Sequence, residues 1–269
     1  MWIKYNERRI EAKKGITLQE IKKRYKPEAD VVIYNGAPMP KDVTLKNGDE
    51  VVLIRRGEIP SKKELEALMV SRHTPGVHEK VKKCTVGIAG AGGLGSAVAI
   101  ALARIGMGKI VIVDDDVVEP SNLNRQQFFT DQIGQPKVKA MKDNLKRINP
   151  YVKVVTHQTR LTEKNIPRIF KKVDVLIEAF DKADQKELII SVATKRLPHI
   201  PLIFVSGLAG YESNNTIKTR KVGKNLYAIG DLKTAARPGC GLMAPRVGIA
   251  AHHEANAALR IILGEDPSK

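Results

Sequence analysis

Residues 85–96 read Thr-Val-Gly-Ile-Ala-Gly-Ala-Gly-Gly-Leu-Gly-Ser. The apolar run 85–89 predicts a buried strand, and the small apolar residues that follow the glycines predict a helix. Gly90, Gly92 and Gly95 let the backbone turn sharply between the two and approach a charged ligand closely. Unpaired N–H groups and the helix dipole attract anions at a helix N-terminus. The stretch therefore predicts a nucleotide phosphate site, although a glycine turn needed only for tight strand–helix packing would show the same pattern.

The residues after this stretch continue the alternation of strand and helix. The next expected strand, 109–113, is followed by Asp114. An acid about 20 residues beyond the last glycine is placed to accept hydrogen bonds from ribose hydroxyls. Strand and helix patterns alternate up to residue 206, and a last helix is expected over 245–263. This order favours an α/β, Rossmann-like domain with a doubly wound, mainly parallel sheet. Residues 211–239 are polar, and we expect a mobile connection there.

The first part of the chain has the pattern of a separate, small α+β domain. Two short strand patterns flank a polar turn within residues 2–12, and a capping-box spacing, Thr17-Leu-Gln-Glu20, opens a helix. Two further strands are expected at 31–34 and 50–56. Hairpin, helix and two strands is the order of a ubiquitin-like β-grasp. We therefore divide the chain into a β-grasp domain (1–57), a helical linker (58–84) and a nucleotide-binding domain (85–269).

Composition limits the classes of function. The 269 residues include 46 Lys and Arg against 29 Asp and Glu, a formal net charge of +17. Such a charge favours an anionic partner, such as a nucleotide, RNA or an acidic protein, or else reflects a lysine-rich surface that aids solubility. The two cysteines exclude a disulfide framework and a four-cysteine zinc site, and they fit a reducing cytoplasm. We expect a cytoplasmic protein without a membrane partner, because no apolar stretch is long enough to span a bilayer.

Charged residues gather after the predicted strands. Three adjacent acids, Asp114, Asp115 and Asp116, open the run Asp-Asp-Asp-Val-Val-Glu-Pro-Ser-Asn-Leu-Asn-Arg-Gln. Three acids at a strand end are costly unless a cation or hydroxyl binds them. Lys137 begins a helix, where the dipole favours an acidic residue, so a lysine there indicates a bound anion. The strand expected within 173–179 is followed by another acid, Asp181, at the same edge of the sheet.

These motifs resemble the ThiF/MoeB/HesA family, the bacterial relatives of ubiquitin-activating enzymes. The resemblance runs from about residue 72 to residue 264. It rests on three motifs: the glycine loop, the Asp-x-Asp…Ser-Asn-Leu-x-Arg-Gln run and Gly-x-Pro-Lys. Arg72-His-Thr-Pro and the stretch 241–248 are most similar to the ThiF-type branch that accompanies a ThiS carrier. Asn35-Gly36 together with Leu45-x-x-Gly-Asp-x-Val-x-Leu-Ile resembles the ThiS/MoaD sulfur carriers themselves.

The resemblance implies an ATP- and Mg²⁺-dependent nucleotidyltransferase, a sulfur carrier protein adenylyltransferase of thiamine thiazole biosynthesis. In such an enzyme the C-terminal glycine carboxylate of a separate ThiS-like carrier attacks the α-phosphate of ATP and pyrophosphate leaves. The resemblance also implies a homodimer. The carrier-like domain of this chain departs from the carriers at its end, where Arg55-Arg-Gly-Glu58 continues without a terminal Gly-Gly. We therefore expect a docking or regulatory domain that is not itself adenylated.

The same resemblance assigns roles to individual residues. Gly90, Gly92, Gly93 and Gly95 surround the phosphates, Asp114 binds the ribose, Asp116 and Asn122 line the pocket, Arg125 and Lys137 stabilise charge on the phosphates, and Asp181 holds Mg²⁺ with Asp184 as its competitor. Arg72 matches an arginine that in related dimers reaches the partner subunit's site. Cys240 lies near the position of a sulfur-handling cysteine of some relatives, with a small buried thiol as the alternative.

Three other functions remain open at this point. An adenylating dehydratase that modifies tRNA would suit the positive charge, although a tRNA enzyme has no evident use for a carrier-like domain. An NAD-dependent oxidoreductase shares the glycine fingerprint but leaves Arg125 and Lys137 without a role. A non-catalytic scaffold would bind nucleotide while the fused domain occupies the surface to which a carrier docks.

Overall fold

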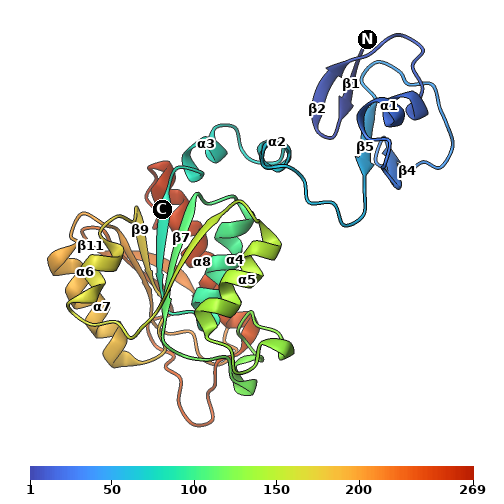
Figure 1. The fold of residues 1–269 in the computed structure, drawn as a ribbon. Coiled ribbons are helices and arrows are strands. Elements are labelled where there is room, and N and C mark those ends of the chain that lie inside the picture. Colours follow the sequence, from blue (N-terminus) through green and yellow to red (C-terminus); the bar gives the residue numbers. More distant parts are fainter. The chain divides into compact units, whose positions relative to one another are not determined.

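The computed structural model describes all 269 residues, which form two compact units, Met1–Pro75 and Gly76–Lys269 (Figure 1). The division after Pro75 falls inside the stretch 58–84 that we expected to be a linker. This stretch holds helix α2 (Lys62–Val70) in the first unit and helix α3 (Val77–Val81) in the second. Each unit is described by itself.

The first unit is a β-grasp domain, as the sequence predicts. Its sheet has the order β2-β1-β5-β3-β4, and its first and last strands, β1 and β5, pair in parallel at the centre. The helix α1 (Leu18–Tyr25) begins at the predicted capping box, in which Thr17 and Glu20 exchange hydrogen bonds. Leu18 and Ile21 of this helix are buried in a core with Ile3, Val51 and Leu53 of the sheet. The strands are β1 (Trp2–Tyr5), β2 (Arg8–Glu11), β3 (Val31–Tyr34), β4 (Ala37–Pro38) and β5 (Glu50–Ile54).

The helix α2 differs from its prediction in one respect. Ser61 caps it as expected, by accepting a hydrogen bond from the backbone N–H of Glu64 at 3.3 Å. The apolar face of residues 65, 68 and 69, which its spacing predicts to be core, contains no buried residue. Helical periodicity shows that a helix has an apolar face, and it does not say whether another element covers that face.

The second unit is built on a seven-stranded sheet with the order β11-β12-β10-β9-β6-β7-β8. All neighbours pair in parallel except β11 and β12, which confirms the expected mainly parallel sheet. The strands are β6 (Thr85–Ala89), β7 (Lys109–Asp114), β8 (Lys153–Gln158), β9 (Val175–Glu178), β10 (Leu202–Val205), β11 (Lys218–Gly223) and β12 (Leu226–Gly230).

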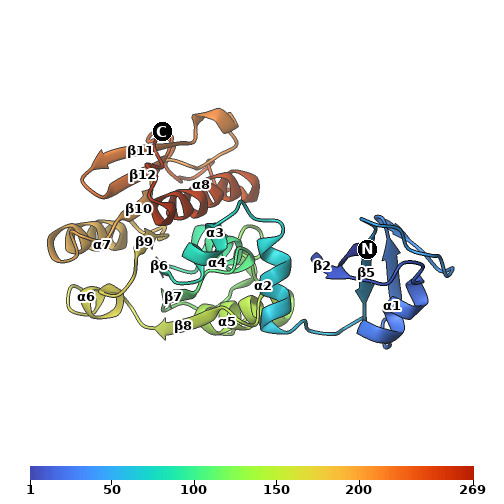
Figure 2. The ribbon, with the colours of Figure 1, turned by 90° about the horizontal axis from the view of Figure 1, so that it is seen from above.

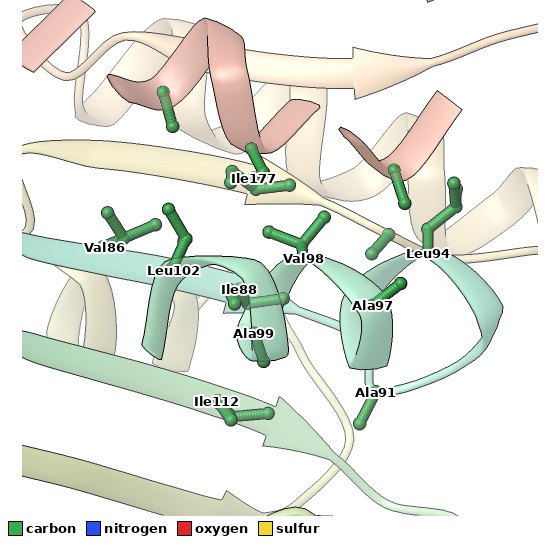
Figure 3. Packing of buried hydrophobic residues seen from close by; sticks show 14 of the residues in the cluster. Val86, Ile88, Ala91, Leu94, Ala97, Val98, Ala99, Leu102, Ile112 and Ile177 are labelled. Carbon is green, nitrogen blue, oxygen red and sulfur yellow. The ribbon is translucent and has the colours of Figure 1, made fainter. Parts of the chain in front are cut away.

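Helices cover both faces of this sheet. One face is covered by α4 (Gly93–Arg104), α5 (Lys137–Ile148) and α8 (Ala244–Leu263), and the other by α6 (Asn165–Phe170) and α7 (Ala183–Arg196) (Figure 2). The sheet has a hydrophobic core on each face, and residues of β6 enter both. Val86 and Ile88 of β6 pack with Val98 and Leu102 of α4 in one of these cores, as Figure 3 shows. No helix has the length and apolar character needed to cross a membrane.

The stretch 211–239, which we expected to be a mobile connection with weak strand patterning, includes two strands of the sheet. It contains β11 and β12, and β12 extends the parallel sheet beside β10. Tyr227, Ala228 and Ile229 are buried, so a short apolar core segment lies between polar flanks. The polar average of the whole stretch conceals these few residues.

The strand order determines where a ligand can bind. The chain passes from β6 to β7 on one side of β6 and later returns to β9 on its other side. The connections that leave β6 and β9 therefore run in opposite directions across the sheet, which opens a crevice at the carboxyl ends of these strands. Ligands of doubly wound sheets bind in this crevice.

The close approach of α4 to β6 yields a prediction. A Cβ on Gly95 would lie 1.9 Å from the carbonyl oxygen of Gly90, whereas a Cβ on Gly248, also in a helix, would meet nothing within 4 Å. We expect Gly95→Ala to lower the free energy of unfolding by about 1–3 kcal/mol or more, because backbone must shift. Gly248→Ala, the matched control, should raise it by about 0.5–1 kcal/mol through helix propensity. Urea unfolding followed by circular dichroism measures both, and equal effects would contradict the packing role.

Candidate functional site

A cavity of about 470 Å³ opens at the carboxyl ends of β6, β7, β9 and β10. Its walls come from the connections that follow these strands, from the start of α7 and from two loops near α8. The lining residues fall in the segments 90–94, 114–116, 125–126, 179–186, 205–209 and 234–236, with Lys137, Arg160, Leu242 and Val247. Within these segments, residues 91 and 184 do not line the cavity. The cavity therefore occupies the crevice that the strand order predicts.

The glycine loop forms one wall and directs a helix N-terminus at the cavity. Gly90 has a φ of +103°, and a Cβ there would lie 2.7 Å from the carbonyl oxygen of Ala179, so only glycine fits. Gly92 is the N-cap of α4 and offers no side-chain cap, and the first turn of the helix has no acidic residue. Gly92 and Gly93 both line the cavity. The first N–H groups of α4 and the positive end of its dipole are therefore available to an anion.

Asp114 is the buried acid of the site. Its Oδ2 accepts a hydrogen bond from the backbone N–H of Ala91 at 2.6 Å, and its Oδ1 accepts one from that of Asp116 at 2.8 Å. Burial raises the pKa of Asp114, and these two hydrogen bonds offset part of that effect. A carboxylate offers about four lone-pair positions, so two remain for hydroxyl donors of a ligand.

Lys137 is a buried cation at the start of α5. Its Nζ lies 2.9 Å from Oδ2 of Asp116, whose side chain is 58% exposed against 7% for the lysine. Its backbone N–H donates to the carbonyl of Asp116 at 3.0 Å, so strand end and helix start are joined twice. The ammonium group of Lys137 is thus held at the cavity by a carboxylate that remains largely in water. An anionic ligand in the cavity can therefore bind the same ammonium group.

Arg125 and Gln126 reach the cavity from the loop after the short helix η1 (Pro120–Asn122). The Nη1 of Arg125 donates to the carbonyl of Ser121 and to Oδ1 of Asn124, both uncharged, so no carboxylate neutralises the guanidinium. Gln126 is buried, and its Oε1 has no hydrogen-bond partner. The sequence analysis quoted Gln126 within a motif and assigned it no role. An unpartnered buried oxygen in a cavity wall makes Gln126 a candidate ligand contact.

Two aspartates competed for the metal role, and only one lines the cavity. Asp181 lies in the turn between β9 and α7 and lines the cavity. Asp184 lies in α7, is exposed and pairs with Arg160 at 3.5 Å. Asp115, to which the sequence analysis gave no separate role, also lines the cavity. One carboxylate oxygen from each of Asp114, Asp115 and Asp116 lies within 4.8 Å of the other two, so oxygen ligands suited to a hard divalent cation are close at hand.

Three further residues from the predicted site, besides Asp184, do not line the cavity. Asn122 is buried, and its Oδ1 accepts the N–H of Glu119 at 3.1 Å, so it caps η1 and shapes the loop that carries Arg125. Gly95 lies inside α4 and permits the close approach of the helix to Gly90. Arg72 lies in the first unit, where its exposed guanidinium donates to Glu7.

The far half of the cavity has a neutral lining that sequence reasoning missed. It consists of small and apolar residues of the loop after β10 (206–209) and of the loop 234–236. The second loop is held by Asp231, which accepts N–H donors of Lys233 and Thr234 at 2.8 Å and pairs with the buried Arg246 at 2.7 Å. The first loop follows an expected strand, so the carboxyl-end rule could have found it. Cys240 does not line the cavity, and its half-buried sulfur lies beside Gly210.

Comparison of the sequence with known protein families finds two that match this chain. The model of the ThiF family matches residues 66–269, and that of ThiS-like ubiquitin matches residues 1–57. The sulfur carrier protein adenylyltransferase of Thermus thermophilus is 35% identical over 131 residues, which cover 48% of each chain. The adenylyltransferase and sulfurtransferase UBA4 of Saccharomyces cerevisiae is 31% identical over 205 residues, which cover 73% of this chain and 46% of that protein. The match thus spans less than half the length of either relative.

A solved structure shares the fold of the second unit. The E. coli tRNA N6-threonylcarbamoyladenosine dehydratase TcdA, in complex with ATP, superposes with a TM-score of 0.68 at 21% identity. The superposition covers 77% of this chain and 98% of that one. At this identity the likeness concerns the fold.

The anchoring of the loop 234–236 by Asp231 yields a second prediction. Burial alone would raise the pKa of Asp231, but hydrogen bonds from Thr234, Lys233 and Arg246 outweigh it and hold the pKa at about 2, against 3.8 for an ordinary aspartate. A lowered pKa stabilises the folded chain at neutral pH, and this stability is lost as the pH falls from 3.8 toward 2. We expect Asp231→Asn to lower the free energy of unfolding by about 2 kcal/mol at pH 7.

Urea unfolding at pH 7 and at pH 2.5 measures this stability. The difference between wild type and Asp231→Asn should shrink at the lower pH, whereas the exposed Asp143→Asn should differ little from wild type at either pH. A difference in the free energy of unfolding that is the same at both pH values would contradict a stabilising role for the charge of Asp231.

Proposed function

The chain belongs to the ThiF family, and from this premise and the cavity geometry we propose that it is an ATP-dependent adenylyltransferase. Its substrate would be the C-terminal glycine carboxylate of a ThiS-like sulfur carrier protein, and pyrophosphate would be released. Within this proposal residues 85–269 are the adenylating domain, residues 1–57 a carrier-like domain and residues 58–84 the linker. A cytoplasmic homodimer that supplies sulfur for thiamine is the setting we propose.

One observation carries the proposal: an uncapped helix N-terminus and two cations, Arg125 and Lys137, converge on one cavity with the buried Asp114. The helix and cations offer positive charge for phosphates, and Asp114 offers acceptors for ribose hydroxyls. An NAD-dependent oxidoreductase needs the helix and the acid, but it has no use for both cations in addition. Adenylation needs all of them.

The reaction brings two anions together. A carboxylate oxygen of the carrier forms a bond to the α-phosphorus of ATP, and the bond from that phosphorus to the bridging oxygen of pyrophosphate breaks. Fixed cations lower the barrier because the negative charge shifts toward the leaving group during the transfer. Lys137 is anchored on the exposed Asp116, and Arg125 has only neutral partners, so both can bind phosphate oxygens without losing a buried ion pair.

The acidic residues of the cavity fit a magnesium ion. Asp181 and the oxygens of Asp114–Asp116 are the hard ligands that Mg²⁺ prefers, and phosphate oxygens would complete its coordination. We propose Asp181 as the protein ligand. The ion would neutralise phosphate charge when bound.

The neutral far half of the cavity suits the carrier's tail. Its walls include Gly207, Ala209, Ala235 and Ala236, which leave room for an extended backbone with little side-chain volume. A glycine-rich C-terminus satisfies this condition, and a bulky one does not. We propose that the tail enters between the loops 206–209 and 234–236.

A second function is supported by a separate observation. The net charge of +17 suits a nucleic acid, and TcdA, which shares the fold, is a tRNA-modifying dehydratase. Adenylation of a tRNA-borne carboxylate would use the same cations. The ThiS-like domain favours the carrier protein as substrate. Salt-sensitive binding of tRNA together with failure of every carrier would support the alternative.

Pyrophosphate exchange into ATP tests the proposed activity. We expect exchange that depends on an added carrier with a Gly-Gly end, and Lys137→Ala and Arg125→Ala should each lower its kcat by about 10²–10³-fold, because each removes a fixed charge from the transition state. Lys142→Ala, an exposed lysine of the same helix α5, is the matched control and should retain wild-type rates. Exchange that survives both substitutions, or none with any carrier, would contradict the assignment.

The carrier-like domain yields a prediction of its own. Its last residues do not form a free tail: Glu58 pairs with Lys26 at 2.9 Å, and the N–H of Arg56 donates to Asp30 at 3.1 Å. Gly57 is followed by an amide and therefore offers no carboxylate. We expect intact-mass measurement after incubation with ATP to find no AMP or thiocarboxylate adduct on this chain, while a separate Gly-Gly carrier in the same tube becomes adenylated. An adduct on a Gly57 released by processing would overturn this role.

A further inference from the structure

Glu178, the last residue of β9, joins two parts of the chain at the cavity. It is fully buried. Its Oε1 accepts the backbone N–H of Phe180 at 2.7 Å, and its Oε2 pairs with Nζ of Lys186 in α7. One carboxylate thus binds the backbone that leaves the strand and a side chain of the helix that follows.

The turn between these anchors is a wall of the cavity. Residues 179–182 all line it, and Lys186 lines it as well. At its start the turn is held by the N–H of Ala179, which donates to Ala89 at 2.8 Å. Asp181, at its exposed part, makes no hydrogen bond or ion pair within the chain. The position of the Asp181 carboxylate therefore depends on the anchors of the turn.

A second buried acid makes the pair more sensitive to change. Glu254 of α8 is fully buried, and neither of its carboxylate oxygens has a hydrogen-bond partner. Burial and the neighbouring Glu178 raise the pKa of Glu254 well above the ordinary value, which favours its neutral form. Lys186 is the cation that pairs with Glu178, so removal of the lysine leaves the buried carboxyl group of Glu178 without its partner.

We propose that Glu178 and Lys186 are positioning residues that hold the turn 179–182, and through it the carboxylate of Asp181, at the phosphate end of the cavity. This inference rests on the proposed function for the role of Asp181. Neither residue need touch the substrate, because the ion pair acts through the backbone between its two ends. Phe180 of the turn packs against the core, and no other side-chain hydrogen bond or ion pair holds the turn.

Calorimetric titration of the full chain with ATP, in excess Mg²⁺ and in EDTA, tests the inference without turnover. In wild type we expect Mg²⁺ to strengthen ATP binding, and Asp181→Asn should abolish this gain. Glu178→Gln and Lys186→Met should each reduce the gain at least tenfold and leave the affinity in EDTA within about twofold of wild type. Lys195→Met, an exposed lysine at the end of α7, is the matched control and should bind as wild type does.

A double variant separates positioning from folding. Glu178→Gln with Lys186→Met removes both members of the ion pair together and leaves neither without its partner, so its thermal midpoint should return toward that of wild type. The gain from Mg²⁺ should stay absent, because the pair no longer holds the turn. In the Asp181→Asn background neither single substitution should weaken ATP binding in Mg²⁺ any further.

Several results would overturn the inference. They are a full Mg²⁺ gain in Glu178→Gln or Lys186→Met, an equal loss of affinity with and without Mg²⁺, and a double variant that regains both stability and the gain. A wild type without any Mg²⁺ gain would overturn it too. Failure of the proposed function is a different outcome: wild type would bind ATP with the Mg²⁺ gain and yet exchange no pyrophosphate with any carrier.

Discussion

The contact between the start of α4 and the end of β6 is the constraint on which the rest of the site depends. Gly95 and Gly90 meet so closely that a Cβ on Gly95 would overlap a carbonyl oxygen. This approach brings the uncapped helix N-terminus to the sheet edge where Asp114 ends β7 and Asp181 follows β9. A helix displaced by one side chain would present its N–H groups elsewhere. The anion site at the N-terminus of α4 is therefore a consequence of backbone packing. The charged side chains around the cavity add to the positive charge that this N-terminus already supplies.

Those charged side chains share a pattern that follows from the cost of burying charge. Lys137 is held by the exposed Asp116, and Lys186 by the buried Glu178, whereas Arg125 rests on neutral oxygens. A cation whose partner is exposed can turn toward a ligand at little cost, but a cation whose partner is buried cannot leave it. The cost of burying charge thus distinguishes Lys137 and Arg125, which can bind phosphate, from Lys186, which holds the cavity wall in place. Distance from the cavity would not have made this distinction, because all three line it.

Much of the fold could be predicted from local patterns, and the failures have physical causes. The glycine loop, the alternation after residue 85 and the capping box at Thr17 each depend on residues near in sequence, and the structure contains the elements they predict. The strand β12 was missed because three buried residues were averaged with polar neighbours. Gly90, Asp114, Lys137 and Asp181 come together as the carboxyl-end rule predicts. The roles of Glu178 and Glu254 could not be predicted, because a buried acid on a strand or helix looks like a surface acid until its tertiary neighbours are known.

The carrier-like domain has the fold of a ThiS-like ubiquitin, and its sequence continues past Gly57 without a Gly-Gly end. Its core depends on Ile3, Leu18 and Leu53, and none of these residues is needed for a reactive end. A carrier needs in addition a flexible terminus with a free carboxylate, and here an amide and an ion pair from Lys26 to Glu58 occupy that place. Folding energy and reactivity reside in different residues of a β-grasp. A β-grasp domain can therefore keep its fold without the free carboxylate that a carrier needs.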